Sequence, residues 1–236
     1  MSARGGAGAR LRGYAHVGVA TFVLIHMACA GGWAWGRVPE LLRAAGHEAH
    51  APDLDLSAGQ TPTTQAARVA EEVPGDGEVV IVGHSYGGMV VPPLADLLEP
   101  GVRHLIVLDG FMPGDGDSAF SMTSPEAEAS RRAAAADRGD GRWPPPVRGA
   151  GEPEWMDRLV PMPISSFAEP VRVTPSVAAL PGTFVRCTRS DMDAQAERAR
   201  RRGWPVVEIN ASHYVPLMRP DACVELLLAA PPGLRV

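Results

Sequence analysis

The stretch from Glu78 to Gly87 reads Glu-Val-Val-Ile-Val-Gly-His-Ser-Tyr-Gly, and it decides the fold. Residues 78–82 are an apolar, β-branched run typical of a buried strand, and residues 86–99 are predicted to form a helix. A Gly-x-Ser-x-Gly sequence between a strand and a helix is a nucleophile elbow, a turn so tight that glycine must flank the serine two positions away on each side. The strain of this turn lifts the Oγ of Ser85 clear of the sheet, where it can react.

Composition narrows the class of protein. A chain of 236 residues is long enough for one sizeable domain with a full core. Its net charge of −5 includes no long run of one sign, so nothing indicates a nucleic-acid partner. The chain has no lysine, which excludes Schiff-base chemistry on a lysine amine. Three cysteines (Cys29, Cys187 and Cys223) are too few and odd in number for a disulfide framework, and they favour a reducing, cytoplasmic compartment.

The N-terminal region has the outline of a signal peptide. Arginines precede an apolar run from Tyr14 to Ile25, and the small residues Ala28-Cys-Ala30 mimic a cleavage site. His16 interrupts the apolar run, which is also too short to span a bilayer. We therefore predict a disordered tail over residues 1–12, a core strand over residues 21–25, and no membrane partner.

Strand and helix patterns alternate through most of the chain. Strands are predicted at 21–25, 48–51, 78–82, 104–108, 183–187 and 206–209, and helices at 35–45, 63–73, 86–99, 194–202 and 220–230. This alternation predicts an α/β fold in which helices cover both faces of a mostly parallel sheet. Residues 113–170 break the pattern and are too long for an ordinary loop. We predict a core formed by residues 13–112 and 171–236, with an inserted lid over residues 113–170.

Polar residues follow the last two predicted strands. Asp191 comes shortly after the strand at 183–187, and His213 follows the next strand. In an open α/β sheet the active site lies at the carboxyl ends of the strands, so both side chains are expected beside Ser85. In a Ser-His-Asp triad the histidine takes the serine proton and the acid orients the histidine. Asp193 follows Asp191 so closely that the sequence leaves both open as the acid.

Two backbone N–H groups would complete such a site by binding the oxyanion. The first belongs to Tyr86, the residue after the nucleophile. The second is expected in the loop after the first strand, which reads His-Met-Ala-Cys-Ala-Gly-Gly-Trp over residues 26–33.

This loop is part of a longer stretch, Phe22–Asp53, that resembles the esterase and hydroxynitrile-lyase branch of the α/β-hydrolase superfamily, which includes plant methyl-ester esterases and bacterial relatives. Further matching motifs are Gly83-His-Ser-Tyr-Gly-Gly88, Cys187-Thr-x-x-Asp191, and Ser212-His213 followed by Arg219-Pro220. The resemblance runs from about Phe22 to Leu228 and implies the α/β-hydrolase fold. It also implies that Ala28, the second residue after His26, supplies the second oxyanion N–H.

Two positions depart from the pattern of that branch. Its esterases have glycine directly after the first-strand histidine, whereas this chain has Met27, which is expected to narrow the pocket or shift the loop. Its lyases have threonine there and lysine after the catalytic histidine, where this chain has Tyr214. Tyrosine does not supply the cation that stabilises departing cyanide, so the departures favour ester hydrolysis over cyanide release.

The function predicted from the sequence is that of a serine hydrolase acting through an acyl-enzyme. The apolar and aromatic residues of the lid predict a small-to-medium apolar or aromatic ester, thioester or lactone as the acyl substrate. The side chains expected to bind it are Met27, Trp143, Trp155, Met156 and Tyr214. A non-hydrolytic lyase, cyclase or acyl transferase is the main alternative, and a catalytically silent binding protein is a third class. No metal-ligand spacing or dinucleotide fingerprint occurs, so no cofactor is expected; whether the chain forms a homodimer is left open.

Overall fold

In the computed structural model, residues 19–74 and 77–231 are described, and the tail predicted for residues 1–12 lies outside them. Within the described residues one six-stranded sheet has the order β2-β1-β3-β4-β7-β8, and every neighbouring pair is parallel. Its strands are β1 (Ala20–Ile25), β2 (Glu48–His50), β3 (Glu78–His84), β4 (Val102–Leu108), β7 (Gly182–Arg189) and β8 (Val206–Ser212). The predicted parallel α/β sheet is thereby confirmed.

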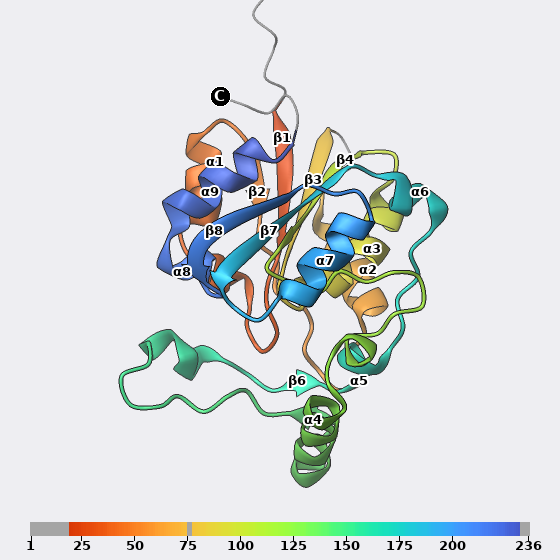
Figure 1. Ribbon diagram of the computed structural model, residues 1–236, viewed down its shortest axis with the longest axis vertical. Coiled ribbons are helices and arrows are strands. Elements are labelled where there is room, and N and C mark those ends of the chain that lie inside the picture. Colours follow the sequence, from red (N-terminus) through yellow and green to blue (C-terminus); the bar gives the residue numbers. More distant parts are fainter. Residues whose placement is uncertain (1–18, 75–76, 232–236) are drawn as a thin grey trace, which may run out of the picture.

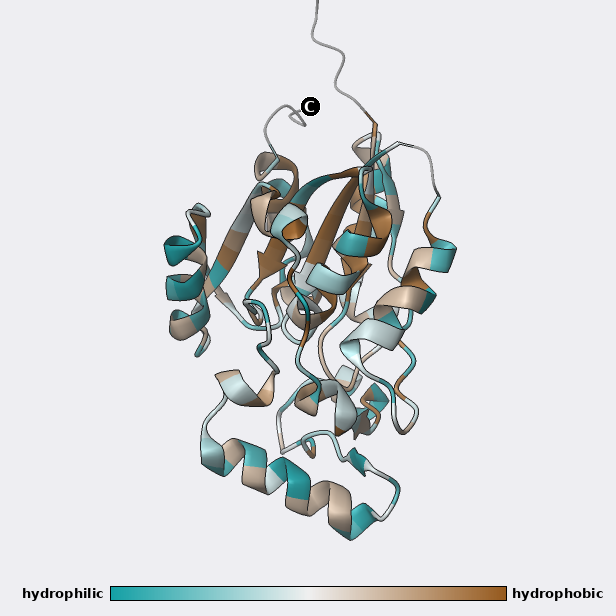
Figure 2. Cartoon of the chain, turned by 90° about the vertical axis from the view of Figure 1, so that its right-hand side faces the viewer, coloured by the Kyte–Doolittle hydropathy of each residue, from teal (hydrophilic) through white to brown (hydrophobic). Residues whose placement is uncertain are grey.

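Helices cover both faces of this sheet, as Figure 1 shows. They are the 3₁₀ helix η1 (Gly32–Trp35) and the α-helices α1 (Val38–Ala44), α2 (Pro62–Glu72), α3 (Gly87–Leu98), α6 (Pro175–Ala179), α7 (Asp193–Arg201), α8 (Val215–Met218) and α9 (Pro220–Ala229). Side chains of β1 alternate between the two layers because successive strand residues point to opposite faces. Val23 and Ile25 pack with α2 and α3, whereas Phe22 and Leu24 pack with α1 and α9. The strands are accordingly the most hydrophobic part of Figure 2.

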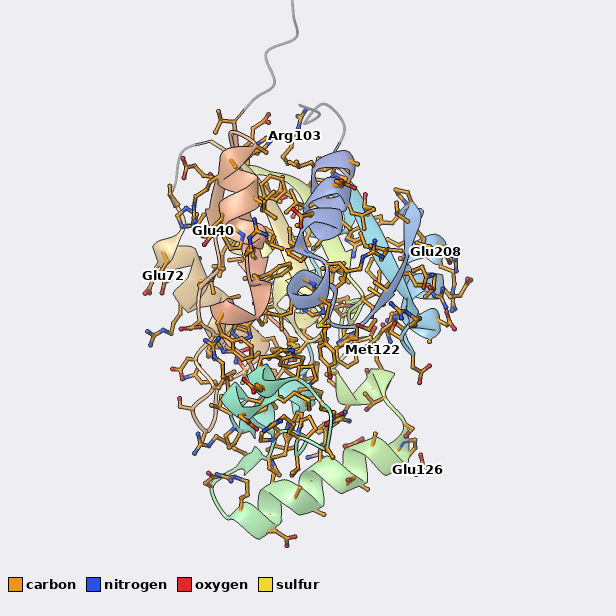
Figure 3. All side chains as sticks on the ribbon, turned by 90° about the vertical axis from the view of Figure 1, so that its left-hand side faces the viewer. Glu40, Glu72, Arg103, Met122, Glu126 and Glu208 are labelled. Carbon is orange, nitrogen blue, oxygen red and sulfur yellow. The ribbon has the colours of Figure 1, made fainter. Side chains whose placement is uncertain are left out.

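Residues 113–170, which we call the cap, lie between β4 and β7 in the chain. They contain η2 (Phe120–Met122), α4 (Pro125–Arg138), β5 (Arg142–Trp143), η3 (Glu154–Arg158), β6 (Met162–Pro163) and α5 (Ser165–Ala168), with β5 and β6 pairing antiparallel. Figure 3 shows Arg103, at the start of β4, and Glu126, in the first turn of α4, at opposite ends of the molecule. The cap therefore lies beyond the carboxyl ends of the strands.

Helix α4 stands apart from the sheet and depends on local signals for its formation. The Ser124 side chain accepts a hydrogen bond from the Ala127 N–H at 3.2 Å, Pro125 occupies the first turn, and Gly139 ends the helix in a left-handed conformation. Alanine-rich sequence between these ends has the highest helix propensity. Ala135 is the only α4 residue that is fully buried. The rest of the helix surface is free to face solvent or a cavity.

Candidate active site

Ser85 lies at the turn between β3 and α3, where the sequence placed it. Its φ of 56° is in the left-handed region, which is strained for a residue with a side chain. A Cβ on Gly83 would lie 2.7 Å from the Gly87 backbone, and a Cβ on Gly87 would lie 2.5 Å from the carbonyl oxygen of Ile25. Only glycine fits at both positions. The predicted turn is present, and its backbone holds the serine at the carboxyl edge of the sheet.

His213 follows β8 and is oriented by a carboxylate from β4. Its Nδ1 donates a hydrogen bond of 2.7 Å to Oδ2 of Asp109, a side chain with no exposed surface. The other oxygen, Oδ1, accepts from the Cys187 N–H at 2.9 Å and from the Ser190 hydroxyl at 2.8 Å. Burial alone would raise the pKa of Asp109, but these hydrogen bonds outweigh burial and hold the pKa below its ordinary value. A buried, ionised carboxylate therefore fixes the proton of His213 on Nδ1.

The structure corrects the predicted acid. Asp191 is exposed, and in the described part of the chain it has no hydrogen bond or ion pair. Asp193 is bonded to the Arg186 guanidinium. Neither contacts His213, because the chain turns outward after β7, whereas Asp109 immediately follows β4 inside the sheet. Asp109 directly follows the strand predicted at 104–108, so the sequence also indicates it as a candidate acid. The motif at Cys187–Asp191 favours Asp191 instead.

His84 holds the backbone beside His213. Its ring is 2% exposed, and burial together with the charge of nearby His213 lowers its pKa to about 3. The neutral ring donates from Nε2 to the carbonyl oxygen of His213 at 2.8 Å, and the two rings lie 5.0 Å apart. The residue before Ser85 thus positions the loop that carries His213.

The loop over residues 26–33, which carries the predicted second oxyanion donor, is oriented by His26. Burial lowers the pKa of this histidine to about 4, so it is neutral; Nδ1 donates to the Met27 carbonyl at 2.8 Å, and Nε2 accepts from the Leu54 N–H at 3.0 Å. In a trans peptide the C=O and the next N–H point in opposite directions, so the Ala28 N–H points away from the His26 ring. Among the described residues, neither the Ala28 N–H nor the Tyr86 N–H has an acceptor. Both predicted donors are available to a ligand.

Contacts on either side hold this loop in place. The Gly32 N–H donates to Oδ1 of Asp53 at 2.6 Å, and a Cβ on Gly32 would lie 2.0 Å from the carbonyl oxygen of Ala51. From the cap, the Val160 N–H donates to the Cys29 carbonyl at 2.8 Å. The loop is therefore fixed between the core and the cap, as a preorganised oxyanion site requires.

Core and cap together line a cavity of about 580 Å³ that opens to solvent. Its lining includes Ser85, His213 and Ala28 from the core. From the cap it includes Ala127, Ser130, Arg131, Ala134, Trp143, Pro144, Pro145, Pro146 and Leu159. A volume of this size suits a small organic ligand, and most of the surface is apolar.

Three of the five predicted substrate-binding side chains line this cavity, namely Met27, Trp143 and Tyr214. Trp155 and Met156 do not, which corrects the prediction. Both belong to η3, where the Trp155 ring packs 4.7 Å from the Tyr214 ring and Met156 is buried. Trp155 therefore supports a wall of the cavity from behind. Arg131, which the sequence reading did not single out, lines the cavity instead.

Among the residues that the structure describes, no group of three or more His, Cys, Asp or Glu side chains is arranged to hold a metal ion. Within the same residues, none of the helices has both the length and the hydrophobicity needed to cross a bilayer.

Comparison with known sequences places this geometry in a family. The model of the α/β hydrolase family matches residues 22–226. A carbendazim hydrolyzing esterase from Nocardioides sp. (strain SG-4G) is 30% identical over 244 residues, an alignment that spans 89% of this chain and 99% of that protein. Salicylic acid-binding protein 2 of Nicotiana tabacum is 35% identical over 105 residues, 39% of this chain and 40% of that protein.

Solved structures agree on the fold. The structure titled as an extracellular α/β-hydrolase from a Paenibacillus species has a TM-score of 0.81 at 19% identity, covering 90% of this chain and 99% of that one. An alpha-hydroxynitrile lyase of Arabidopsis thaliana, 32% identical over 39% of this chain and 40% of the lyase, joins the esterases among the sequence relatives and confirms the predicted resemblance to that branch. The chain belongs to the α/β hydrolase family, and its esterase relatives identify it as a hydrolase.

Proposed function

We propose that this protein hydrolyses carboxylic esters through a covalent acyl-enzyme on Ser85. The observation that carries the proposal is the hydrogen bond from His213 to the buried Asp109 carboxylate, in the wall of the cavity that also exposes the elbow serine. The relative that matches nearly the whole chain is named an esterase, which supports the reaction class.

The proposed reaction proceeds in two halves. Because Asp109 keeps a proton on Nδ1 of His213, Nε2 is free to accept the proton of Ser85 as its Oγ attacks the acyl carbon. The carbonyl oxygen becomes an oxyanion that accepts hydrogen bonds from the Ala28 and Tyr86 N–H groups. Collapse of this intermediate breaks the bond to the leaving oxygen, which takes the proton from His213. Water then attacks the acyl-enzyme with His213 as base, releasing the acid and restoring Ser85.

The lining of the cavity supports a substrate class. Met27 and Trp143 contribute apolar surface to the lining, and three of the four α4 residues in it, Ala127, Ser130 and Ala134, are small. We therefore propose a small-to-medium apolar or aromatic ester, thioester or lactone, with the body of the substrate held under the cap. Relatives named methylesterases support a small leaving alcohol, although each aligns over less than half of its length.

The test is covalent labelling of the serine. A fluorophosphonate probe with intact-mass detection should add one label to the wild-type protein and none to Ser85→Ala, and 4-nitrophenyl acetate should be hydrolysed only by the wild type. His213→Ala should lose both signals while circular dichroism shows an unchanged fold. Failure of the folded wild-type protein to label, or equal turnover by Ser85→Ala, would overturn the proposal.

The cytoplasmic location and a homodimer stay predictions. The three cysteines are free and buried, which suits a reducing compartment, whereas the Paenibacillus protein of similar structure is titled extracellular.

A further inference from the structure

One permanently charged side chain lies among the residues that line the active-site cavity. This is Arg131 of α4; apart from the titratable His213, every other lining residue is uncharged, and none is Asp or Glu. Arg131 shares a helix face with Ala127, Ser130 and Ala134, at the i, i+3, i+4 and i+7 spacing that places side chains on one side of a helix. Its neighbours on that face are small, so Arg131 is the only long side chain that this face contributes to the lining.

Arg131 has no carboxylate partner among the described residues. Its one hydrogen bond is a 3.4 Å contact to the Ala127 carbonyl in its own helix. The next residue, Arg132, differs: it is paired with Glu128 at 2.7 Å. The Arg131 side chain is half-buried, and this burial lowers the pKa of its guanidinium. A partly buried charge without a partner is costly, and an anion that enters the cavity would offset that cost.

The guanidinium is held in place by aromatic rings. Its central carbon lies 5.3 Å from the ring centroids of both Trp143 and Phe167, and Trp143 itself lines the cavity. Cys29, which lies in the loop over residues 26–33, lines the same cavity as Arg131, and the charge of Arg131 opposes the rise in pKa that burial causes at the Cys29 thiol. Aromatic rings supply no carboxylate or carbonyl acceptor, so apart from the group that donates to the Ala127 carbonyl the N–H groups of the guanidinium remain for a ligand, and a carboxylate can accept two of them.

We propose that Arg131 binds a carboxylate of the substrate, so that the preferred substrates are esters that carry a free carboxylate on an apolar or aromatic body. The proposal rests on ester hydrolysis at Ser85 and names the substrate class of that same site. Arg131 then acts as a specificity-determining residue, because it holds the anionic end of the substrate under the cap while the ester group lies at Ser85.

Matched pairs of esters test this preference. In one pair, 4-acetoxybenzoate and 4-acetoxybenzamide, the charge lies on the leaving group; in the other, monomethyl terephthalate and methyl 4-carbamoylbenzoate, it lies on the acyl group. The measured quantity is the ratio of kcat/KM for the carboxylate to that for the carboxamide. Comparing this ratio between proteins cancels the intrinsic reactivity of the esters.

Removal of the charge should lower that ratio. Arg131→Gln should reduce it about 10- to 100-fold in at least one pair, the range for a hydrogen bond to a charged group. Arg131→Lys keeps the charge but cannot donate two parallel hydrogen bonds to one carboxylate, so its ratio should lie between those of the wild type and Arg131→Gln. Arg132→Gln, the neighbouring arginine that already has a carboxylate partner, should leave the ratio unchanged. A packing defect would lower kcat/KM equally for the carboxylate and the carboxamide of a pair. The ratio therefore distinguishes loss of carboxylate recognition from a general structural defect.

Binding gives a readout that does not depend on turnover. In Ser85→Ala, calorimetry should show the carboxylate binding at least tenfold more tightly than the carboxamide in at least one of the two pairs, and adding Arg131→Gln should abolish the difference. Ratios within threefold of wild type in both pairs, or equal affinity for carboxylate and carboxamide in both pairs in Ser85→Ala, would overturn the proposal. Failure of ester hydrolysis itself is distinct: it would show as no labelling of Ser85 and no turnover of either carboxamide, whatever the binding result.

Discussion

Asp109→Asn should lower kcat for ester hydrolysis by roughly 10³- to 10⁴-fold while the protein remains folded. The substitution keeps the size and shape of the side chain and removes only its charge and one acceptor. Its effect therefore reports on the orientation of His213 and not on packing.

The magnitude follows from the hydrogen bonds around the carboxylate. One oxygen of Asp109 accepts from the Cys187 N–H and the Ser190 hydroxyl, and the other faces Nδ1 of His213. Asparagine has a single oxygen, and placing its NH₂ against the Cys187 N–H would leave a buried donor unpaired at a cost of about 1–3 kcal/mol. The amide oxygen therefore stays with Cys187, and the NH₂ faces His213. Nδ1 must then accept a hydrogen bond, which moves the ring proton to Nε2, where it blocks proton transfer from Ser85.

The assay combines turnover of 4-nitrophenyl acetate with the rate of fluorophosphonate labelling, and thermal melting checks the fold. Asp191→Asn is the matched control: the same chemical change at an exposed carboxylate should leave kcat within about twofold of wild type. If Asp109→Asn kept kcat within tenfold of wild type, or if Asp191→Asn caused the larger loss, the assignment of Asp109 as the orienting acid would be refuted.

Two further predictions concern stability. Burial lowers the pKa of His26 to about 4 and of His84 to about 3 from 6.5, so below about pH 6.5 the unfolded chain binds more protons than the folded one. The free energy of unfolding should therefore decrease as the pH is lowered through that range. Near pH 4 the loss should be about 3 kcal/mol for each histidine. Urea unfolding at several pH values measures this slope, and a flat profile would contradict it. Gly110→Ala should cost about 1–3 kcal/mol and lower turnover, because a Cβ there would lie 2.5 Å from the Ser85 carbonyl oxygen. Gly149→Ala, where the nearest atom is a flexible Glu152 oxygen at 3.3 Å, is its control in the same urea and turnover assays, and equal losses in both variants would refute the argument.

The core could be predicted from the sequence because its signals are local. An apolar β-branched run such as residues 78–82 forms a buried strand wherever it meets neighbours of the same kind, and glycine at 83 and 87 is demanded by the turn itself. The positions of Ser85 and His213 follow from the strands that precede them.

The orienting acid required information that local sequence does not hold. Asp109 and Asp191 both come between Ser85 and His213 in the chain, and both follow a predicted strand, so chain order does not distinguish them. The choice depends on how far each strand extends before the chain turns away. Strand β7 continues to Arg189, which carries Asp191 out to the surface, whereas β4 ends at Leu108 and leaves Asp109 between the Cys187 backbone and His213.

The lining of the cavity was the least predictable part, because a helix over a cavity obeys a different pattern from a helix on a core. The helix face that packs on a core carries large apolar side chains, and the sequence of α4 has no such stripe. By the same criterion the large apolar side chains of Trp155 and Met156 are predicted to line a pocket. The structure reverses these roles: η3 uses Trp155 to support Tyr214, and α4 turns Ala127, Ala134 and Arg131 towards Ser85. Small side chains leave space for a ligand, and an arginine without a partner supplies charge that packing does not require. These are the properties of a surface that binds a ligand, and they become recognisable only once the fold has placed α4 opposite the nucleophile.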